Sequence, residues 1–204
     1  KRKKSQNQSI DARSAITEDL KVNSNYKKPQ AIKIPDEVKR EAVEYAKGLD
    51  KDRHFRRRVG NFWDLYRSCI GQIMVHRYLT SLKIAHDYMK PYHSEGRPAN
   101  EYDIRIQDLG EFDVKCRGRW NEEYFYNIKI LIAEHEREER LKTDYYIFCT
   151  TDKELKNFYI LGVLSYKDLW NKLHKPEDRE YKFPVAGYIL SREMNDLKKT
   201  IFRV

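Results

Sequence analysis

Two aspartates and a lysine in the middle of the chain have the types and spacing of a small cation-binding site. Asp103 is followed, after nine intervening residues, by the triplet Asp113-Val114-Lys115. Mg²⁺ prefers oxygen ligands, commonly one or two carboxylates, with water and phosphate oxygens in the remaining positions. On a strand, Asp113 and Lys115 share one face, and the Val114 carbonyl between them can serve as a further ligand. Such a set could hold Mg²⁺ beside a phosphate, and an ion bound there can activate water for phosphodiester hydrolysis.

The segment that carries these residues is predicted to be a β-hairpin. Apolar and polar residues alternate through 102–107 and again through 111–117, on either side of the turn sequence Asp108-Leu109-Gly110. Period-two alternation around a turn that ends in glycine is typical of a hairpin. With 108–110 as the loop, Asp103 faces Lys115 and Arg105 faces Asp113. We therefore expect the polar groups of both strands to gather on one side.

The charge of the chain favours a polyanionic partner. Its 204 residues include 41 Lys and Arg against 32 Asp and Glu, which gives a formal net charge of +9 at pH 7. Apart from a basic start at Lys1–Lys4, the positive charge is grouped in two segments that we expect to contact nucleic acid: Arg56, Arg57 and Arg58, and then Arg117 and Arg119. The second segment directly follows Lys115. Cations beside an acidic cluster suit a site that holds phosphates close to carboxylates.

The remaining pattern predicts an α/β fold whose helices position the hairpin. Residues 1–34 are polar and basic and are expected to form an N-terminal arm, and residues 35–204 a single domain. Helices are expected at 36–47, where Gly48 would be the stop, at 61–82 and at 128–141. Buried strands are expected at 145–149, 158–163 and 185–190, and Ser165 should cap a short helix reaching Leu173. This order indicates a central mixed β-sheet flanked by helices.

Over about residues 60–165 the chain resembles the PD-(D/E)XK nuclease superfamily. The resemblance rests on Asp103, the triplet Asp113-Val114-Lys115 and the helix before them. It implies a restriction-endonuclease-like core of the order αβββαβ. It also implies that Asp103, Asp113 and the Val114 carbonyl bind Mg²⁺, with Mn²⁺ as a substitute, and that Lys115 orients the attacking water.

The chain departs from the family pattern at two positions. Tyr102 precedes Asp103 where the family's name has a proline, and Gln72 follows Gly71 where a helix glutamate is frequent. An amide oxygen can still ligate Mg²⁺ or its water, so Gln72 is counted with the catalytic residues. The replacement of the helix glutamate by Gln72 leaves open whether one or two metal ions bind.

The resemblance also sets expectations for activity and assembly. Archaeal resolvases, restriction endonucleases and nucleases of archaeal viruses share this core, which implies a metal-dependent endonuclease acting on DNA, with structure-specific cleavage as a resolvase-like option. A homodimer is expected because cutting both strands usually needs two sites. No organic cofactor is expected.

Two interpretations without catalysis remain open for the same residues. A charged ladder on a solvated sheet, Asp103 with Lys115 and Arg105 with Asp113, explains the alternation equally well. A nuclease-like fold with Gln72 in place of an acid could also bind nucleic acid without cleaving it. The three cysteines lack Cys-x-x-Cys spacing and are expected to be buried, and the histidines, His76 and His86 among them, show no ligand spacing.

No apolar run approaches the roughly 18 to 20 residues that span a bilayer. We therefore expect an intracellular protein without a membrane partner, which would lie in the host cytoplasm if the chain is viral.

Overall fold

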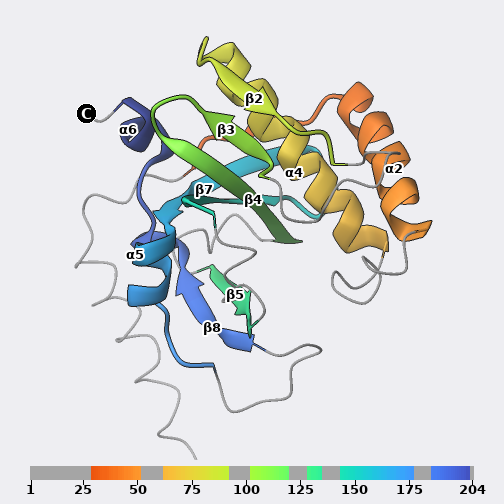
Figure 1. Cartoon of the computed structure of the whole chain (residues 1–204). Coiled ribbons are helices and arrows are strands. Elements are labelled where there is room, and N and C mark those ends of the chain that lie inside the picture. Colours follow the sequence, from red (N-terminus) through yellow and green to blue (C-terminus); the bar gives the residue numbers. More distant parts are fainter. Residues whose placement is uncertain are drawn as a thin grey trace, which may run out of the picture.

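The computed structural model describes residues 29–51, 62–91, 102–119, 128–134, 143–176 and 185–202, with the backbone alone at 50, 51, 117–119 and 185. At its centre is a six-stranded mixed sheet with the strand order β1-β7-β6-β4-β3-β2 (Figure 1). The strands are β1 (Ile32–Lys33), β2 (His86–Tyr88), β3 (Ile104–Ile106), β4 (Gly110–Arg119), β6 (Tyr145–Thr151) and β7 (Asn157–Ser165). Strands β4 and β6 run parallel, and every other neighbouring pair is antiparallel. The long strand β4 therefore lies at the middle, between the hairpin partner β3 and the buried strand β6.

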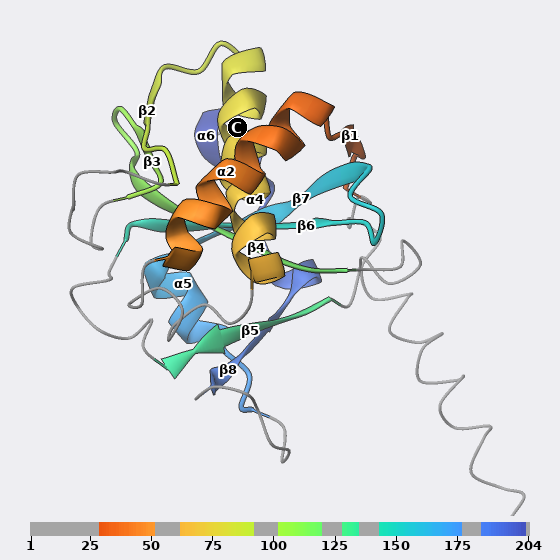
Figure 2. The ribbon, with the colours of Figure 1, turned by 90° about the vertical axis from the view of Figure 1, so that its right-hand side faces the viewer.

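Two helices cover one face of this sheet. They are α2 (Asp36–Lys51) and α4 (Phe62–Ser81), and both lie on the same side of β4, β6 and β7 (Figure 2). Gly71 allows α4 to approach the sheet closely, because a Cβ added there would lie 2.3 Å from the Cβ of Cys116. The core beneath α4 contains Ile104, Val114 and Cys116. Alternate residues of β3 and β4 thus point toward the helix, as the period-two pattern predicts.

A smaller layer lies on the other side of the sheet (Figure 2). Strand β5 (Lys129–Ala133) pairs with β8 (Val185–Leu190) in an antiparallel two-stranded sheet, and α5 (Tyr166–Asn171) lies nearby. A second apolar cluster joins Ile130 and Ile132 of β5 to Tyr146 and Phe148 of β6. A 3₁₀ turn, η4 (Ser191–Glu193), leads to α6 (Leu197–Phe202), which packs on the first core through Leu197.

Much of the expected architecture is confirmed. The chain is a mixed α/β structure with a central mixed sheet flanked by helices. The helix expected at 61–82, the strands expected at 145–149, 158–163 and 185–190, and the short helix after Ser165 are found with ends within two residues. Ser165 caps that helix by accepting the Asp168 amide at 3.0 Å. All three cysteines are buried and free, as expected. No helix among the described residues is long and apolar enough to cross a membrane.

Three expectations are wrong. The first helix does not stop at Gly48 but continues to Lys51, since the next turn buries Leu49, which is 8% exposed. The helix expected at 128–141 is a strand over 129–133, and residues 135–142 lie outside the described residues. The domain begins before residue 35, because β1 pairs with β7 and Ile34 is 2% exposed. Most of the proposed arm, residues 1–28, lies outside the described residues.

Candidate functional site

The hairpin of β3 and β4 is present, but its register differs by two residues from the expected one. Ile106 pairs with Gly110 and Arg105 with Glu111, so the loop is 107–109 and not 108–110. Gly110, with φ 118°, is already the first residue of β4, and a Cβ there would lie 2.2 Å from Asp144 Oδ2. The left-handed position of the loop is taken by Asp108, with φ 68°. Continued along both strands, this register brings Asp103 opposite Asp113 and not opposite Lys115.

Asp103 lies where the regular pairing of β3 ends. Its backbone amide donates to the Phe112 carbonyl at 3.1 Å, and its carbonyl accepts from Met89 at 2.9 Å. The Val114 amide donates to the Asp103 side chain, at 2.8 Å from Oδ2. A carboxylate thus takes the place of a backbone acceptor in the ladder. The Asp103 carboxyl group is consequently held at the level of the sheet, beside the middle of β4.

The carboxyl groups of Asp103 and Asp113 meet at this point. Burial, the charge of Asp113 and a hydrogen bond between the two carboxyl groups raise the pKa of Asp103 well above its ordinary value. The Val114 amide and Lys115 act in the opposite direction but do not offset these causes. Two carboxylates in contact cannot both stay ionised at low cost unless a proton or a cation lies between them. The Asp103 and Asp113 carboxylates therefore repel each other, and a bound cation would relieve this repulsion.

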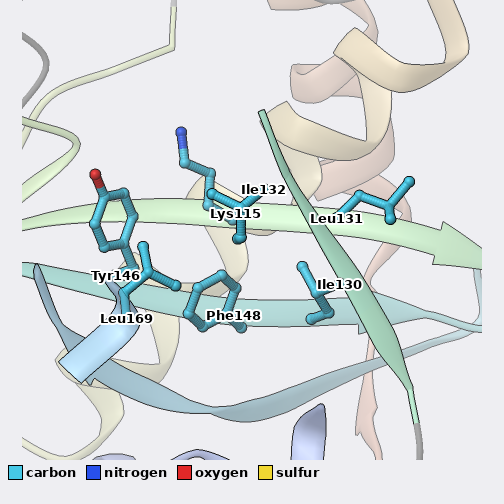
Figure 3. A pocket seen from close by; sticks show the side chains of 7 residues that line it. All are labelled: Lys115, Ile130, Leu131, Ile132, Tyr146, Phe148 and Leu169. Atoms are coloured by element: carbon cyan, nitrogen blue, oxygen red, sulfur yellow. The ribbon is translucent and has the colours of Figure 1, made fainter. Parts of the chain in front are cut away.

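Lys115 lies on the same face of β4 as Asp113 and forms an ion pair with it, 2.8 Å from Nζ to Oδ2. The side chains of Lys115 and Asp113 are 21% and 28% exposed, so the pair is reachable from solvent. The lysine nitrogen also lies 5.7 Å from the centre of the Tyr146 ring. In Figure 3 the nitrogen of Lys115 is directed away from Ile130 and Phe148, which line a small pocket with its side chain. The stem of Lys115 is thus packed against apolar groups while its ammonium is presented beside Asp113.

Gln72 belongs to α4, which covers the face of the sheet opposite the one that carries Lys115. Its amide oxygen is buried and accepts no hydrogen bond from the described residues. One turn earlier, burial raises the pKa of the Cys69 thiol to about 12, and the Asp103 carboxylate adds to this shift. Positions 69 and 72 share a helix face. Asp103 therefore lies near Asp113 and Lys115 of β4 and acts on Cys69 of α4, the helix that also carries Gln72.

The charged ladder proposed as an alternative does not form with the expected partners. Arg105 pairs with Glu111 across the hairpin at 2.5 Å, and Lys115 pairs with Asp113 of its own strand. Glu111 is thus engaged by an arginine. The carbonyl of Val114 as a ligand stays a prediction.

The basic residues expected to contact DNA are not placed. Arg56, Arg57 and Arg58 lie outside the described residues. Arg117 and Arg119 belong to β4, directly beyond Lys115, but the described structure does not include their side chains. Their proposed role stays a prediction.

Tyr88 is a neighbour of the site that the sequence did not single out. Its ring stacks on His76 at 4.2 Å between centroids, and its buried hydroxyl finds no partner among the described residues. Burial is the main cause that raises its pKa, followed by Glu41, with Asp103 among the further contributors. Nothing in the local sequence pattern of β2 distinguishes this tyrosine from an ordinary core residue, so the structure was needed to find it.

Within the described part of the chain, no group of three or more His, Cys, Asp or Glu residues is arranged to hold a metal ion. Any further ligand that the described residues supply to a metal at the aspartate pair would therefore be a neutral oxygen. Comparisons with models of protein families, with curated proteins and with solved structures gave no match.

Proposed function

We propose that this chain is a Mg²⁺-dependent endonuclease that hydrolyses DNA phosphodiester bonds. The observation that carries the proposal is the meeting of the Asp103 and Asp113 carboxyl groups, with the Lys115 ammonium 2.8 Å from the second. Two carboxylates and a lysine at one point of a sheet supply metal ligands and a positive charge for a phosphate.

The residues present fit a divalent cation. Burial and then the charge of Asp113 raise the pKa of Asp103, and the Gln72 oxygen is a buried acceptor without a donor among the described residues. Asp103 and Asp113 would hold Mg²⁺ or Mn²⁺, and Gln72 would accept from a water on the α4 side. When bound, the ion would polarise the phosphate and favour deprotonation of water.

The protein groups would divide the remaining work. The Val114 amide holds the Asp103 carboxylate in place, so this ligand is preorganised before any ion binds. The ammonium of Lys115 would orient the attacking water and offset negative charge that develops on the phosphate oxygens. The apolar packing of its stem limits the positions of that ammonium.

The order of elements agrees with the restriction-endonuclease-like core that we propose. Helix α4 is followed by the antiparallel strands β2, β3 and β4, and after a connection β6 joins β4 in parallel. The connection contains β5, where a helix was expected, and its residues 120–127 and 135–142 are outside the described structure. DNA as substrate rests on the formal charge of +9 and the arginine segments. A homodimer would supply the second site for cutting both strands.

A DNA-binding module without cleavage is the second candidate. The observation that favours it is the uncharged Gln72 on α4, where a carboxylate would strengthen metal binding. Both candidates predict DNA binding that weakens with salt. Metal-dependent cleavage separates them.

The test is a cleavage panel with labelled linear, nicked and four-way-junction DNA, each with Mg²⁺, with Mn²⁺ and with EDTA. We expect cleavage of at least one substrate with either ion and none with EDTA. Binding to all substrates without cleavage of any would support the second candidate. Absence of both binding and cleavage would contradict both.

A further inference from the structure

Two histidines that are ten residues apart in the sequence meet beside α4. Nδ1 of His76, in the C-terminal half of α4, lies 2.9 Å from Nε2 of His86, the first residue of β2. The turn between them brings them together: Lys83 adopts φ 58°, and the Ile84 amide returns to the Leu79 carbonyl at 3.1 Å. The chain therefore reverses at the end of α4 and runs back along it.

Both rings are held in orientation by contacts of their own. Nδ1 of His86 lies 2.8 Å from the Ile84 carbonyl, which can only accept, so this nitrogen carries the proton and Nε2 has a free lone pair. The His76 ring stacks on Tyr88 with the planes 9° apart. An imidazole whose far nitrogen donates to a carbonyl is the usual arrangement of a histidine metal ligand. The pair thus brings two imidazole nitrogens to one point, and both lone pairs would face a shared ion once the proton between them moves and the rings turn off the N···N line.

We propose that His76 and His86 form a two-histidine site for a late first-row divalent ion, Cu²⁺ or Ni²⁺. Two nitrogens at neighbouring corners of a square-planar ion with bonds of about 2.0 Å lie about 2.8 Å apart, close to the observed separation. A tetrahedral Zn²⁺ would require about 3.3 Å, so the pair would have to open by about 0.4 Å. The geometry therefore favours a tetragonal ion.

The neutral His76–His86 pair can bind a metal ion without releasing a proton. In the metal-free protein one N–H···N hydrogen bond holds the two rings, with the proton on Nδ1 of His76 because Nε2 of His86 has none. Transfer of that proton to Nε2 of His76 through solvent frees the second lone pair. Burial and the neighbouring His86 lower the pKa of His76, which keeps its ring neutral, and Glu41 lies near enough to act on it in the opposite direction. The described residues supply no third His, Cys, Asp or Glu ligand to the pair.

This site is separate from the aspartate pair, and Mg²⁺ would not occupy it because Mg²⁺ prefers oxygen ligands. The test is a titration of the metal-free protein with Cu²⁺ and with Ni²⁺, followed by calorimetry and, for Cu²⁺, by electron paramagnetic resonance. We expect one equivalent to bind with a two-nitrogen hyperfine pattern. His76→Gln and His86→Gln should each lose that pattern and bind about tenfold or more weakly.

His174→Gln is the matched control, because His174 is also half-buried and is bonded to Glu193 at 2.8 Å, away from the pair. It should keep wild-type affinity and pattern, as should Asp113→Asn, which alters the other site. Melting temperatures of the metal-free variants check that each one folds. Equal Cu²⁺ binding in the wild type and in both histidine variants would overturn the proposal, since the ion would then be held adventitiously by other histidines. A one-nitrogen pattern in the wild type would overturn it as well.

Discussion

Replacing Asp113 by Asn separates the metal-site reading of the hairpin from a purely structural one. The substitution keeps size and shape, removes a charged ligand and ends the conflict with Asp103. It also removes the ion pair with Lys115, whose partners are 21% and 28% exposed, so that this pair contributes about 1 kcal/mol or less. Because loss of the ion pair and relief of the repulsion oppose each other, the metal-free melting temperature should change by less than about 4 °C.

The response to Mg²⁺ should change far more. An ion present at about ten times its Kd stabilises the folded state by about 1.4 kcal/mol. For a chain of this size that corresponds to a rise of about 3 to 6 °C in the wild-type melting temperature. Asp113→Asn should abolish most of this rise. Its cleavage rate should fall by about 10² to 10³, since several kcal/mol of charge stabilisation at the phosphate are lost.

Three measurements decide the matter: Mg²⁺-dependent nicking, DNA affinity in EDTA and melting temperature with and without Mg²⁺. DNA affinity in EDTA should persist or increase, because a negative charge near the phosphates is gone. Glu111→Gln is the matched control, an acid on the same strand that is held by Arg105, and it should nick and respond to Mg²⁺ as the wild type does. If Asp113→Asn nicks DNA at the wild-type rate, the site is elsewhere or does not exist.

Four further changes test the other residues of the site and the proposed DNA interface. Lys115→Ala should abolish most cleavage but leave the Mg²⁺-induced rise in melting temperature intact; loss of that rise would make Lys115 part of the metal site's structure. Asp103→Asn tests the raised pKa of the Asp103 carboxyl group in the folded protein. The wild type and the variant should be equally stable at low pH, and the stability of the wild type should fall relative to the variant as pH rises through that pKa. Melting curves recorded against pH would show this difference. A constant difference at all pH values would contradict the raised pKa. Gln72→Glu should lower the metal-free melting temperature and enlarge the Mg²⁺ response, whereas an unchanged response would make Gln72 a core amide. Neutralising Arg56, Arg57 and Arg58 together should weaken DNA binding and reduce the slope of log affinity against log salt by about 0.9 for each lost contact, and an unchanged slope would exclude them from the DNA interface.

Long or strictly alternating segments could be predicted from the sequence. The helix α4 follows from its recurring apolar residues, and the hairpin from period-two alternation around a turn, because both patterns span many residues that share one environment. The strand β5 could not be separated from a helix in the same way. Its Ile-Lys-Ile-Leu-Ile-Ala run is short and apolar, and what decides it is pairing with β8, a partner more than fifty residues away. The β-branched isoleucines were the local sign that favoured a strand.

The register of the hairpin was the harder part of the site to predict. The preference of glycine for turns predicts Gly110 in the loop, but it stands in β4, where its missing side chain admits Asp144. That acid also accepts the Glu111 amide at 2.9 Å, which anchors the start of β4. Asp144 lies 34 residues further along the chain than Gly110, so no local pattern contains this information. The same limit explains why the meeting of His76 and His86 is visible in three dimensions alone.

The two-residue difference in register changes which charged residues face each other across the hairpin. In the expected pairing each acid would face a base, and the hairpin would need nothing more than its own ion pairs. In the observed pairing Asp103 faces Asp113, and its carboxylate is fixed there by the Val114 amide at 2.8 Å. A single lysine, Lys115, offsets this concentration of negative charge on the described part of the sheet, and the pKa of Asp103 stays raised in its presence. A sheet selected for stability alone would replace one of these acids at little cost, because a neutral amide keeps the hydrogen bond without the repulsion. Proteins keep such unfavourable charge pairs where the groups serve a function, and two adjoining carboxylates are useful where a cation must be held against a phosphate.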